Sequence, residues 1–420
     1  MGRPDYLSPR RGPLNPPSHR RIGLLLSLTV LIVLPAPAAA RTDSSPRLTA
    51  LLARALSVPH VNHARSAALA VDLQTGQVVF TRNRSLSLAP ASTEKLAISY
   101  ALLAIFGPAY RIQTHVLGEG ELEGSTWQGD LVLKGYGDPA LATPALRRLA
   151  AQVRAFGIRR VTGAVVGDES FFDARRTAAG WKPSFYIDES PPLSALTVDR
   201  ASYRGTVSTR PALAAAALFR AALIDAGIKV VGRAEVGQAT SDSRLAAVAS
   251  PPLLHLLKRV NRDSDNFTAE ILLKHLGGVQ DGLGTTTAGA AAVTRTLAAA
   301  GIPLAGVRVV DGSGLSLLDR LTASTLVGIL DAAWNDALLR GSFLASLAVG
   351  GQSGTLAHRL RQPPARGQVF AKTGTTSLSS ALAGYVSGRY AFAVVQNGPP
   401  LPTWWCRQAQ DRFVTVLAAQ

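Results

Sequence analysis

The chain has 420 residues, of which 47% are hydrophobic and 17% charged, so it can bury a sizeable core and is neither disordered nor fibrous. Its formal net charge of +17 favours a weak association with an anionic cell-wall or membrane surface, or simply follows from an arginine-rich composition. No dense basic run with interleaved aromatic residues is present, which argues against a nucleic-acid partner. The single cysteine excludes an internal disulfide and zinc sites built on cysteine pairs.

The start of the chain is typical of an export signal. Several arginines precede an apolar run over 22–34, which is too short to span a bilayer. Ala38, Ala39 and Ala40 then supply an A-x-A cleavage site. We therefore predict a signal peptide over 1–40 and an exported, periplasmic or extracytoplasmic protein, with an uncleaved anchor as the alternative.

Strands are predicted near both ends of the remaining chain, and helices between them. A hairpin is expected over 66–81, followed by a helix over 92–106 that is apolar on all sides and therefore buried. Further on, short strand-like runs at 130–133 and 164–166, with frequent glycines, alternate with helices expected over 144–156 and 211–226. Helices dominate over 252–339, and strands return at 369–371, 381–386 and 390–395.

This order predicts an α+β fold in which one antiparallel sheet uses both chain ends. Helices flank the sheet, and an all-helical subdomain packs on it. The alternating region in the middle is interpreted as an inserted α/β domain. We expect the first part of the main domain over 41–112, the insertion over 113–245 and the second part over 246–420.

The first motif with chemical potential begins the predicted buried helix and reads Ser-Thr-Glu-Lys. Ser92 and Lys95 are three residues apart, so they share one helix face. Free N–H groups and the positive end of the helix dipole surround such a serine. A neutral amine there can deprotonate the hydroxyl, which then attacks a carbonyl carbon. Alone the motif is weak, because a capping serine followed by a surface lysine is more common.

The second motif is Ser264-Asp265-Asn266, just before the helix expected over 267–276. A hydroxyl and an amide two residues apart on a loop can point into one cleft. By itself, such a segment is more often a helix-capping loop.

The third motif is Lys372-Thr373-Gly374, followed by Thr375, at the end of a strand-like run. Alternation along a strand sends Lys372 and Gly374 to one face, and Thr373 and Thr375 to the other. A glycine here lets a ligand approach the backbone closely. By itself, such a segment is more often a β-turn that contains threonine.

In this order the motifs form the triple signature Ser-x-x-Lys, Ser-x-Asn and Lys-Thr-Gly of penicillin-recognising serine acyl-transferases. Only 7 of the 44 lysine and arginine residues are lysine, yet both basic motif positions are lysine. Arginine does not deprotonate in proteins, so it cannot serve as a base. The composition therefore supports a catalytic interpretation of the motifs.

The sequence resembles the D-alanyl-D-alanine carboxypeptidases/endopeptidases of the penicillin-binding protein 4 type over most of the mature chain. Further matching segments lie at 133–139, 167–173, 311–316 and 354–356. The resemblance implies a transpeptidase-like, β-lactamase-like domain split by an insertion, which is short here for the family. After Ser316 the chain continues with Leu317 where relatives have Arg, so no role is assigned to the 311–316 loop.

The resemblance also implies a role for each motif residue. Ser92 attacks the carbonyl between two D-alanines of a peptidoglycan peptide, and Lys95 accepts its proton. Ser264 relays a proton to the leaving amine. The implied substrate-binding residues are Asn266 for the peptide backbone, Lys372, Thr373 and Thr375 for the terminal carboxylate, and Gly374 for close approach of the ligand to the backbone. No metal or organic cofactor is implied, and β-lactams are implied as covalent inhibitors of a cell-wall-associated enzyme.

Rival interpretations stay open at this point. A β-lactamase or esterase with the same motifs needs a further carboxylate for deacylation and a shorter spacing between the first two motifs. A non-catalytic wall-binding module would not need an intact Ser92, Lys95 and Lys372. A Ser-His-Asp hydrolase would carry a G-x-S-x-G elbow, which is absent.

The family resemblance makes Asp188 or Glu189 a weaker candidate for contact with the substrate's side-chain amine. Glu270 is interpreted as structural.

Overall fold

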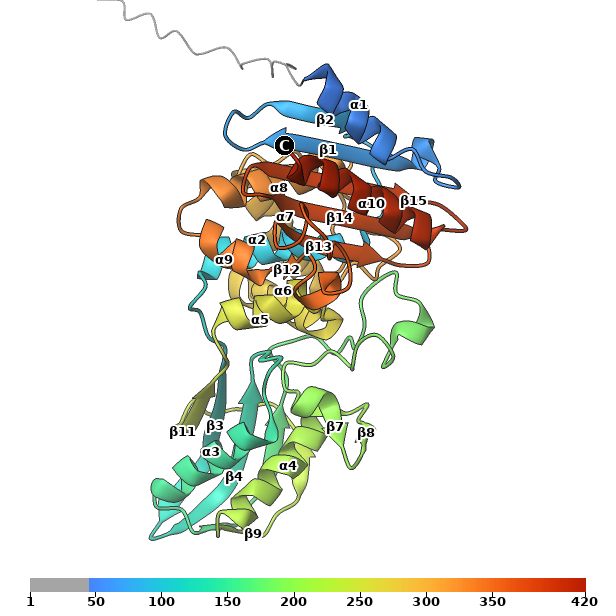
Figure 1. The fold of residues 1–420 in the computed structure, drawn as a ribbon. Helices are drawn as coiled ribbons and strands as arrows, with labels where there is room; N and C mark the ends of the chain where they lie inside the picture. The colour runs from blue at the N-terminus through green and yellow to red at the C-terminus, as the bar shows by residue number, and fades with distance from the viewer. Residues whose placement is uncertain (1–44) are drawn as a thin grey trace, which may run out of the picture. The chain divides into compact units, whose positions relative to one another are not determined.

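The computed structural model describes residues 45–420, so the signal peptide predicted over 1–40 lies outside the described residues. Its first sheet has six antiparallel strands in the order β12-β13-β14-β15-β1-β2 (Figure 1). Both ends of the described chain contribute to it, as predicted. The strands are β1 (Ser66–Asp72), β2 (Val78–Arg82), β12 (Ala348–Val349), β13 (Val369–Thr375), β14 (Ser379–Val386) and β15 (Tyr390–Asn397).

Helices cover both faces of this sheet, which is why its central strands are buried along their whole length. All eight residues of β14 are buried. Because side chains alternate along a strand, Leu382 joins one hydrophobic cluster and Ala383 joins another. The first cluster contains residues of α1 (Pro46–Ala55) and α10 (Thr403–Ala418), and the second contains residues of α8 (Ala323–Asn335).

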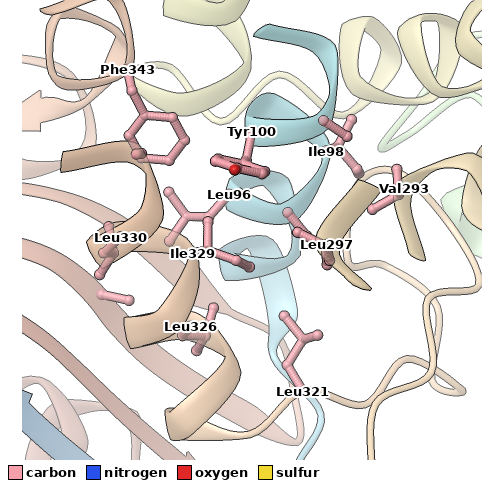
Figure 2. Packing of buried hydrophobic residues seen from close by; sticks show 14 of the residues in the cluster. Leu96, Ile98, Tyr100, Val293, Leu297, Leu321, Leu326, Ile329, Leu330 and Phe343 are labelled. Atoms are coloured by element: carbon pink, nitrogen blue, oxygen red, sulfur yellow. The ribbon is translucent and has the colours of Figure 1, made fainter. Parts of the chain in front are cut away.

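The helical subdomain is built around α2 (Lys95–Phe106), whose sequence has no polar face. Its first nine residues are all buried, as predicted from that pattern. In Figure 2, Leu96 and Tyr100 lie among side chains from neighbouring helices. Those around α2 are α5 (Leu253–Asn261), α6 (Asn266–Asp281), α7 (Thr286–Ala299), α8 and α9 (Arg340–Ser346). Within residues 45–420, no helix has both the length and the apolar character to traverse a bilayer.

The region between the first two motifs forms a second, mixed sheet with its own core. Its strands are β3 (Gln113–Glu123), β4 (Thr126–Gly135), β5 (Arg160–Val161), β6 (Val165–Asp168), β9 (Lys229–Val230), β10 (Ala234–Val236) and β11 (Arg244–Ala249). Strands β4 and β6 are parallel, whereas β3 and β4 are antiparallel. Apolar residues of α3 (Thr143–Ala155) and α4 (Pro211–Asp225) fill the core of this sheet. A two-stranded ribbon, β7 (Ser202–Tyr203) and β8 (Thr206–Val207), completes the region.

Candidate active site

Ser92 lies in a 3₁₀ turn, Ala91–Glu94, that leads directly into α2. The regular helix therefore begins at Lys95, one turn later than predicted. Ala91 has a φ of +48°, an uncommon conformation for a residue with a Cβ. The Thr93 hydroxyl donates to the carbonyl oxygen of Pro90 at 2.7 Å and fixes the turn. The nucleophile candidate is thus held on a tight, locally constrained turn.

Lys95 is completely buried under this turn, and its amine has three polar neighbours. Its Nζ lies 3.0 Å from Ser92 Oγ, 2.9 Å from Asn266 Oδ1 and 2.5 Å from the carbonyl oxygen of Ser313. The last two atoms only accept hydrogen bonds. A neutral amine has two N–H donors and one lone pair, so it satisfies both acceptors and still offers the lone pair to the Ser92 hydroxyl.

The charge state of Lys95 fits this arrangement. Burial lowers the pKa of the Lys95 amine to about 8, although the acids Asp311 and Glu270 act in the opposite direction. Desolvation disfavours the ammonium form, as for other buried lysines. A sizeable minority of molecules therefore carry a neutral amine next to Ser92 at neutral pH.

Lys372 of β13 is the second completely buried lysine of the site. Its Nζ donates to Ser264 Oγ and to the carbonyl oxygen of Thr373, each at 2.8 Å. Burial, and then the nearby Lys95, hold the pKa of Lys372 well below its ordinary value. Ser264 has a φ of +62°, so its backbone is also in the left-handed region.

Ser92, Ser264, Asn266 and Thr375, which come from all three motifs, line one open cleft of about 400 Å³. Other side chains of the cleft are Lys182, Phe185, Glu189, Leu315, Thr376 and Ser377. The structure therefore brings the three motifs together. The buried lysines Lys95 and Lys372 reach this cleft through the hydroxyls of Ser92 and Ser264.

Two predicted binding residues contact protein atoms instead of lining the cleft. The Thr373 hydroxyl donates to Thr355 Oγ1 at 2.8 Å. A Cβ added to Gly374 would lie 2.8 Å from the carbonyl oxygen of Pro90 and 3.2 Å from the Ser92 nitrogen. The glycine thus allows β13 to approach the nucleophile turn, whereas the sequence prediction had a ligand approaching there.

Sequence reasoning missed three groups at the site. The Ser313 carbonyl contacts Lys95 and belongs to the 311–316 loop, to which no role was assigned. Lys182 lines the cleft and donates to Ser377 Oγ at 3.1 Å. Arg407 of α10 lies 3.5 Å from Thr375 Oγ1. The 311–316 segment gave a signal through the family resemblance, and so did the segment around Lys182, in which Asp188 and Glu189 were candidates; Arg407 gave none.

Glu189, a weaker candidate from the sequence, also lines the cleft. The amide nitrogen of Asn266 donates to the Glu189 side chain and to its backbone carbonyl, each at 3.3 Å. Asp188 is not among the residues that line the cleft. Within the described part of the chain, no group of three or more His, Cys, Asp or Glu side chains is arranged to hold a metal ion.

A buried lysine on a serine hydroxyl, with Ser-x-Asn and Lys-Thr-Gly groups around the same cleft, defines a penicillin-recognising serine hydrolase. The profile of the D-Ala-D-Ala carboxypeptidase 3 (S13) family matches residues 48–211 and 204–420, and the chain belongs to this family. It is a serine-type D-alanyl-D-alanine carboxypeptidase of the penicillin-binding kind.

Individual relatives agree with this assignment. The chain is 32% identical to a D-alanyl-D-alanine carboxypeptidase of Actinomadura sp. (strain R39), over 94% of this chain and 90% of the relative. It is also 32% identical to a carboxypeptidase of Mycobacterium tuberculosis, over 92% of this chain and 86% of the relative. Its fold is similar to that of penicillin binding protein 4 from Haemophilus influenzae, with a TM-score of 0.77, 22% identity, and coverage of 88% and 98% of the two chains. The predicted transpeptidase-like fold is therefore confirmed.

Proposed function

We propose that this carboxypeptidase hydrolyses the terminal D-Ala–D-Ala bond of peptidoglycan stem peptides through an acyl-enzyme on Ser92. The observation that supports this most directly is the buried Lys95 amine, 3.0 Å from Ser92 Oγ and hydrogen-bonded to two acceptors. In acylation, Ser92 Oγ attacks the penultimate D-alanine carbonyl while its proton passes to the Lys95 lone pair. The new C–O bond forms as the negative charge develops on the carbonyl oxygen.

Backbone N–H groups of Ser92 and Thr375 are proposed to stabilise that oxyanion, by resemblance to the family. Each such donor is worth about 3–4 kcal/mol in comparable enzymes. Gly374 supports this assignment, because its missing Cβ allows the end of β13 to lie against the Ser92 turn. Both donors can therefore face the same oxygen.

Collapse of the tetrahedral intermediate requires a proton for the leaving D-alanine amine, and we assign its delivery to Ser264. Lys372 donates to Ser264 Oγ, so that oxygen already accepts one hydrogen bond and the serine O–H is free to point toward the amine. As Ser264 passes its proton to the amine, the Lys372 ammonium replaces that proton along the same hydrogen bond, so no alkoxide is left. Water then attacks the acyl-enzyme, and the same groups act in reverse. Each proton that a side chain gains or loses during acylation is therefore restored during deacylation.

Substrate orientation is assigned to Asn266 and to the Lys-Thr-Gly strand. The Asn266 side-chain oxygen accepts from Lys95, so the amide nitrogen is the end that can bind a peptide carbonyl. Its present contacts with Glu189, at 3.3 Å, are long enough to be displaced. Thr375 lines the cleft and Lys372 lies beneath it, which supports their assignment to the terminal carboxylate.

We also propose that the enzyme acts outside the cytoplasm, where peptidoglycan lies, and that it can hydrolyse peptide cross-links. A cross-link ends in a D-alanine carbonyl joined to a side-chain amine, so the acylation chemistry is the same. A predatory endopeptidase of Bdellovibrio bacteriovorus shares the fold, with a TM-score of 0.59 and 18% identity.

The test combines site mapping with wall digestion. After incubation with a labelled penicillin, peptide mass spectrometry should find the acyl group on Ser92, and Ser92→Ala should remain unlabelled. Digests of purified wall should lose terminal D-alanine with the wild type but not with the variant, and loss of cross-linked dimers would add the endopeptidase activity. Labelling of a different serine, or none in folded protein, would overturn the mechanism. Rapid release of the penicillin would favour a β-lactamase.

A further inference from the structure

A group of four buried carboxyl side chains adjoins the Lys95 site, and the proposed mechanism uses none of them. Glu94, Glu270, Asp311 and Asp319 are all completely inaccessible to solvent. Glu94 and one oxygen each of Glu270 and Asp319 have no hydrogen-bond partner among the described residues. Buried acids without partners are unfavourable for folding, so their presence beside the base calls for an explanation.

Glu270 is the member of this group with a direct structural connection to Lys95. Its Oε1 accepts the backbone N–H groups of Gly312 at 2.9 Å and Ser313 at 2.7 Å. The carbonyl oxygen of the same Ser313 accepts from Lys95. Glu270 therefore positions Ser313, whose carbonyl oxygen in turn positions the Lys95 amine.

One face of α6 supplies one acceptor around Lys95, the Asn266 side chain, and supports the other, the Ser313 carbonyl. Asn266 and Glu270 are four residues apart on this helix, so they share a face. Asn266 contacts the Lys95 amine with its own side-chain oxygen, and Glu270 contacts it through Ser313. The two contacts together fix the direction of the lysine lone pair.

The 311–316 loop is wedged between this helix and the nucleophile turn. A Cβ on Gly312 would lie 2.7 Å from the carbonyl oxygen of Ala269, and one on Gly314 would lie 2.0 Å from that of Ala91. Gly314 also has a φ of +77°. Asp311 holds the loop from within, because its side chain accepts the backbone N–H groups of Ser313, Gly314 and Ser316. Glu270 ties the loop to α6, and the close packing leaves the Ser313 carbonyl little room to move.

We propose that Glu270 is a positioning residue of the catalytic site, which anchors Ser313 so that the Lys95 lone pair stays aimed at Ser92. The proposal rests on the assignment of Lys95 as the base. It requires a hydrogen-bond acceptor at position 270 and does not require a negative charge. A permanent carboxylate would indeed oppose the base, because it would favour the ammonium form of Lys95.

The surroundings of Glu270 favour its neutral form. Burial, followed by the nearby Asp311, raises the pKa of Glu270 to about 8, while the hydrogen bonds from the loop act in the opposite direction. The carbonyl oxygen of a protonated carboxyl group still accepts two N–H bonds. Glu270 can therefore anchor the loop without keeping the proton on Lys95. The acids that face it from other elements are Glu94 and Asp311.

The test separates penicillin binding from acylation in four proteins: wild type, Glu270→Ala, Glu270→Gln and Asp168→Ala. Asp168 is a matched control, because it is completely buried and accepts the backbone N–H groups of Ser170 and Ala239 outside the cleft. Glu270→Ala should lower the acylation rate constant at least about tenfold, since small displacements of catalytic groups can reduce rates up to about a hundredfold. The dissociation constant of the non-covalent penicillin complex should stay within about twofold, because Lys95 does not bind the ligand. Rates are expressed per folded molecule, from circular dichroism and acylation stoichiometry.

Glu270→Gln should restore at least a third of the wild-type acylation rate, because an amide oxygen also accepts two N–H bonds. Asp168→Ala should acylate like the wild type per folded molecule. The proposal is overturned if Glu270→Ala acylates within threefold of wild type, or if Glu270→Gln falls as far as Glu270→Ala. Should Glu270→Ala fail to fold, Glu270→Asp replaces it, since the shorter side chain withdraws the acceptor. Failure of wild-type labelling on Ser92 would instead refute the proposed function itself.

Discussion

Lys95 and Lys372 lie completely buried at one cleft, but the charges around them differ. Four acids act on Lys95, namely Asp311, Glu270, Asp265 and Glu94, and they partly offset the effect of burial on its pKa. Among residues 45–420, no acid has such an effect on Lys372, and the charged group that shifts its pKa is Lys95. The polar surroundings of Lys95 are thus complete within the protein. Those of Lys372 lack an anion, which the terminal carboxylate of a substrate would supply.

The comparison teaches that two lysines with equal burial can have different tasks. A base needs a pKa near neutrality and a fixed lone pair, which the acids and acceptors around Lys95 provide. A carboxylate anchor needs no acid of its own, because the bound carboxylate supplies the anion that stabilises the ammonium form of the lysine. Substitution of the two lysines and of the groups around them tests this division, and the largest effect is expected at Lys95.

Lys95→Arg should reduce the acylation rate at least about a hundredfold, because general-base catalysis typically contributes 10²–10⁴. Arginine keeps the charge but does not deprotonate. The measurement is penicillin acylation against pH, with folding checked by circular dichroism. In the wild type, the rate should rise with pH through an apparent pKa near 8 that belongs to the coupled site. A near-normal rate in the folded variant would show that another group is the base.

The acids around Lys95 should also make folding stability depend on pH. The pKa of Glu270 rises from its ordinary 4.5 to about 8 on folding. Below pH 4.5 both the folded and the unfolded state hold the proton, so the full stability is present. As pH rises from 4.5 to about 8, the unfolded state releases the proton first, and stability falls.

At about 1.4 kcal/mol per pKa unit, the loss has an upper limit of about 5 kcal/mol. Glu270→Gln cannot ionise, so the difference between its unfolding free energy and that of the wild type should grow over this pH range. The difference isolates Glu270 from Lys95 and Lys372, whose lowered pKa values act in the opposite direction as pH rises. Denaturant unfolding at several pH values measures it, and a difference that does not change with pH would mean that Glu270 is ionised throughout.

The parts of the molecule that follow from local pattern were predicted well. The apolar run after Lys95 gave a buried helix, and the hairpin expected over 66–81 is present as strands β1 and β2. The three motifs also pointed to one cleft, since their residue types are known to act together. In each case the information lies in neighbouring residues or in a family signature.

The parts that depend on contacts between distant residues were not predictable. The positive φ of Ala91 is not a preference of alanine, and it occurs where Gly314 packs against the Ala91 carbonyl. Glu270 looked structural because nothing near it in the sequence shows that it meets Ser313. Gly374 was correctly singled out for a close approach, but the neighbour that approaches is the Ser92 turn.

Lys372→Ala should lower the hydrolysis of substrates with a free terminal carboxylate by at least about thirtyfold. Removing one partner of a desolvated charge pair commonly costs about 2–5 kcal/mol. A matched substrate with a terminal amide has no such partner, so it should lose much less. The ratio of kcat/KM values for the two substrates is the quantity to measure. Equal losses on both would show that Lys372 is not the anchor.

The smallest expected effect concerns Arg407, whose guanidinium lies at the exposed end of the same carboxylate site. It is 3.5 Å from the Thr375 hydroxyl, and among residues 45–420 no carboxylate forms an ion pair with it. Because Arg407 is exposed, its attraction for a bound carboxylate is screened by water and salt. We therefore expect Arg407→Ala to reduce kcat/KM for the free-carboxylate substrate about two- to fivefold at low ionic strength. The loss should shrink toward zero in 1 M salt, where the Debye length is about 3 Å. Arg412→Ala is the matched control, since Arg412 is an exposed arginine of the same helix α10 and, unlike Arg407, is not hydrogen-bonded to Thr375. If both variants lose the same activity, or if the amide substrate is affected as strongly, the carboxylate is held by Lys372 and Thr375 without Arg407.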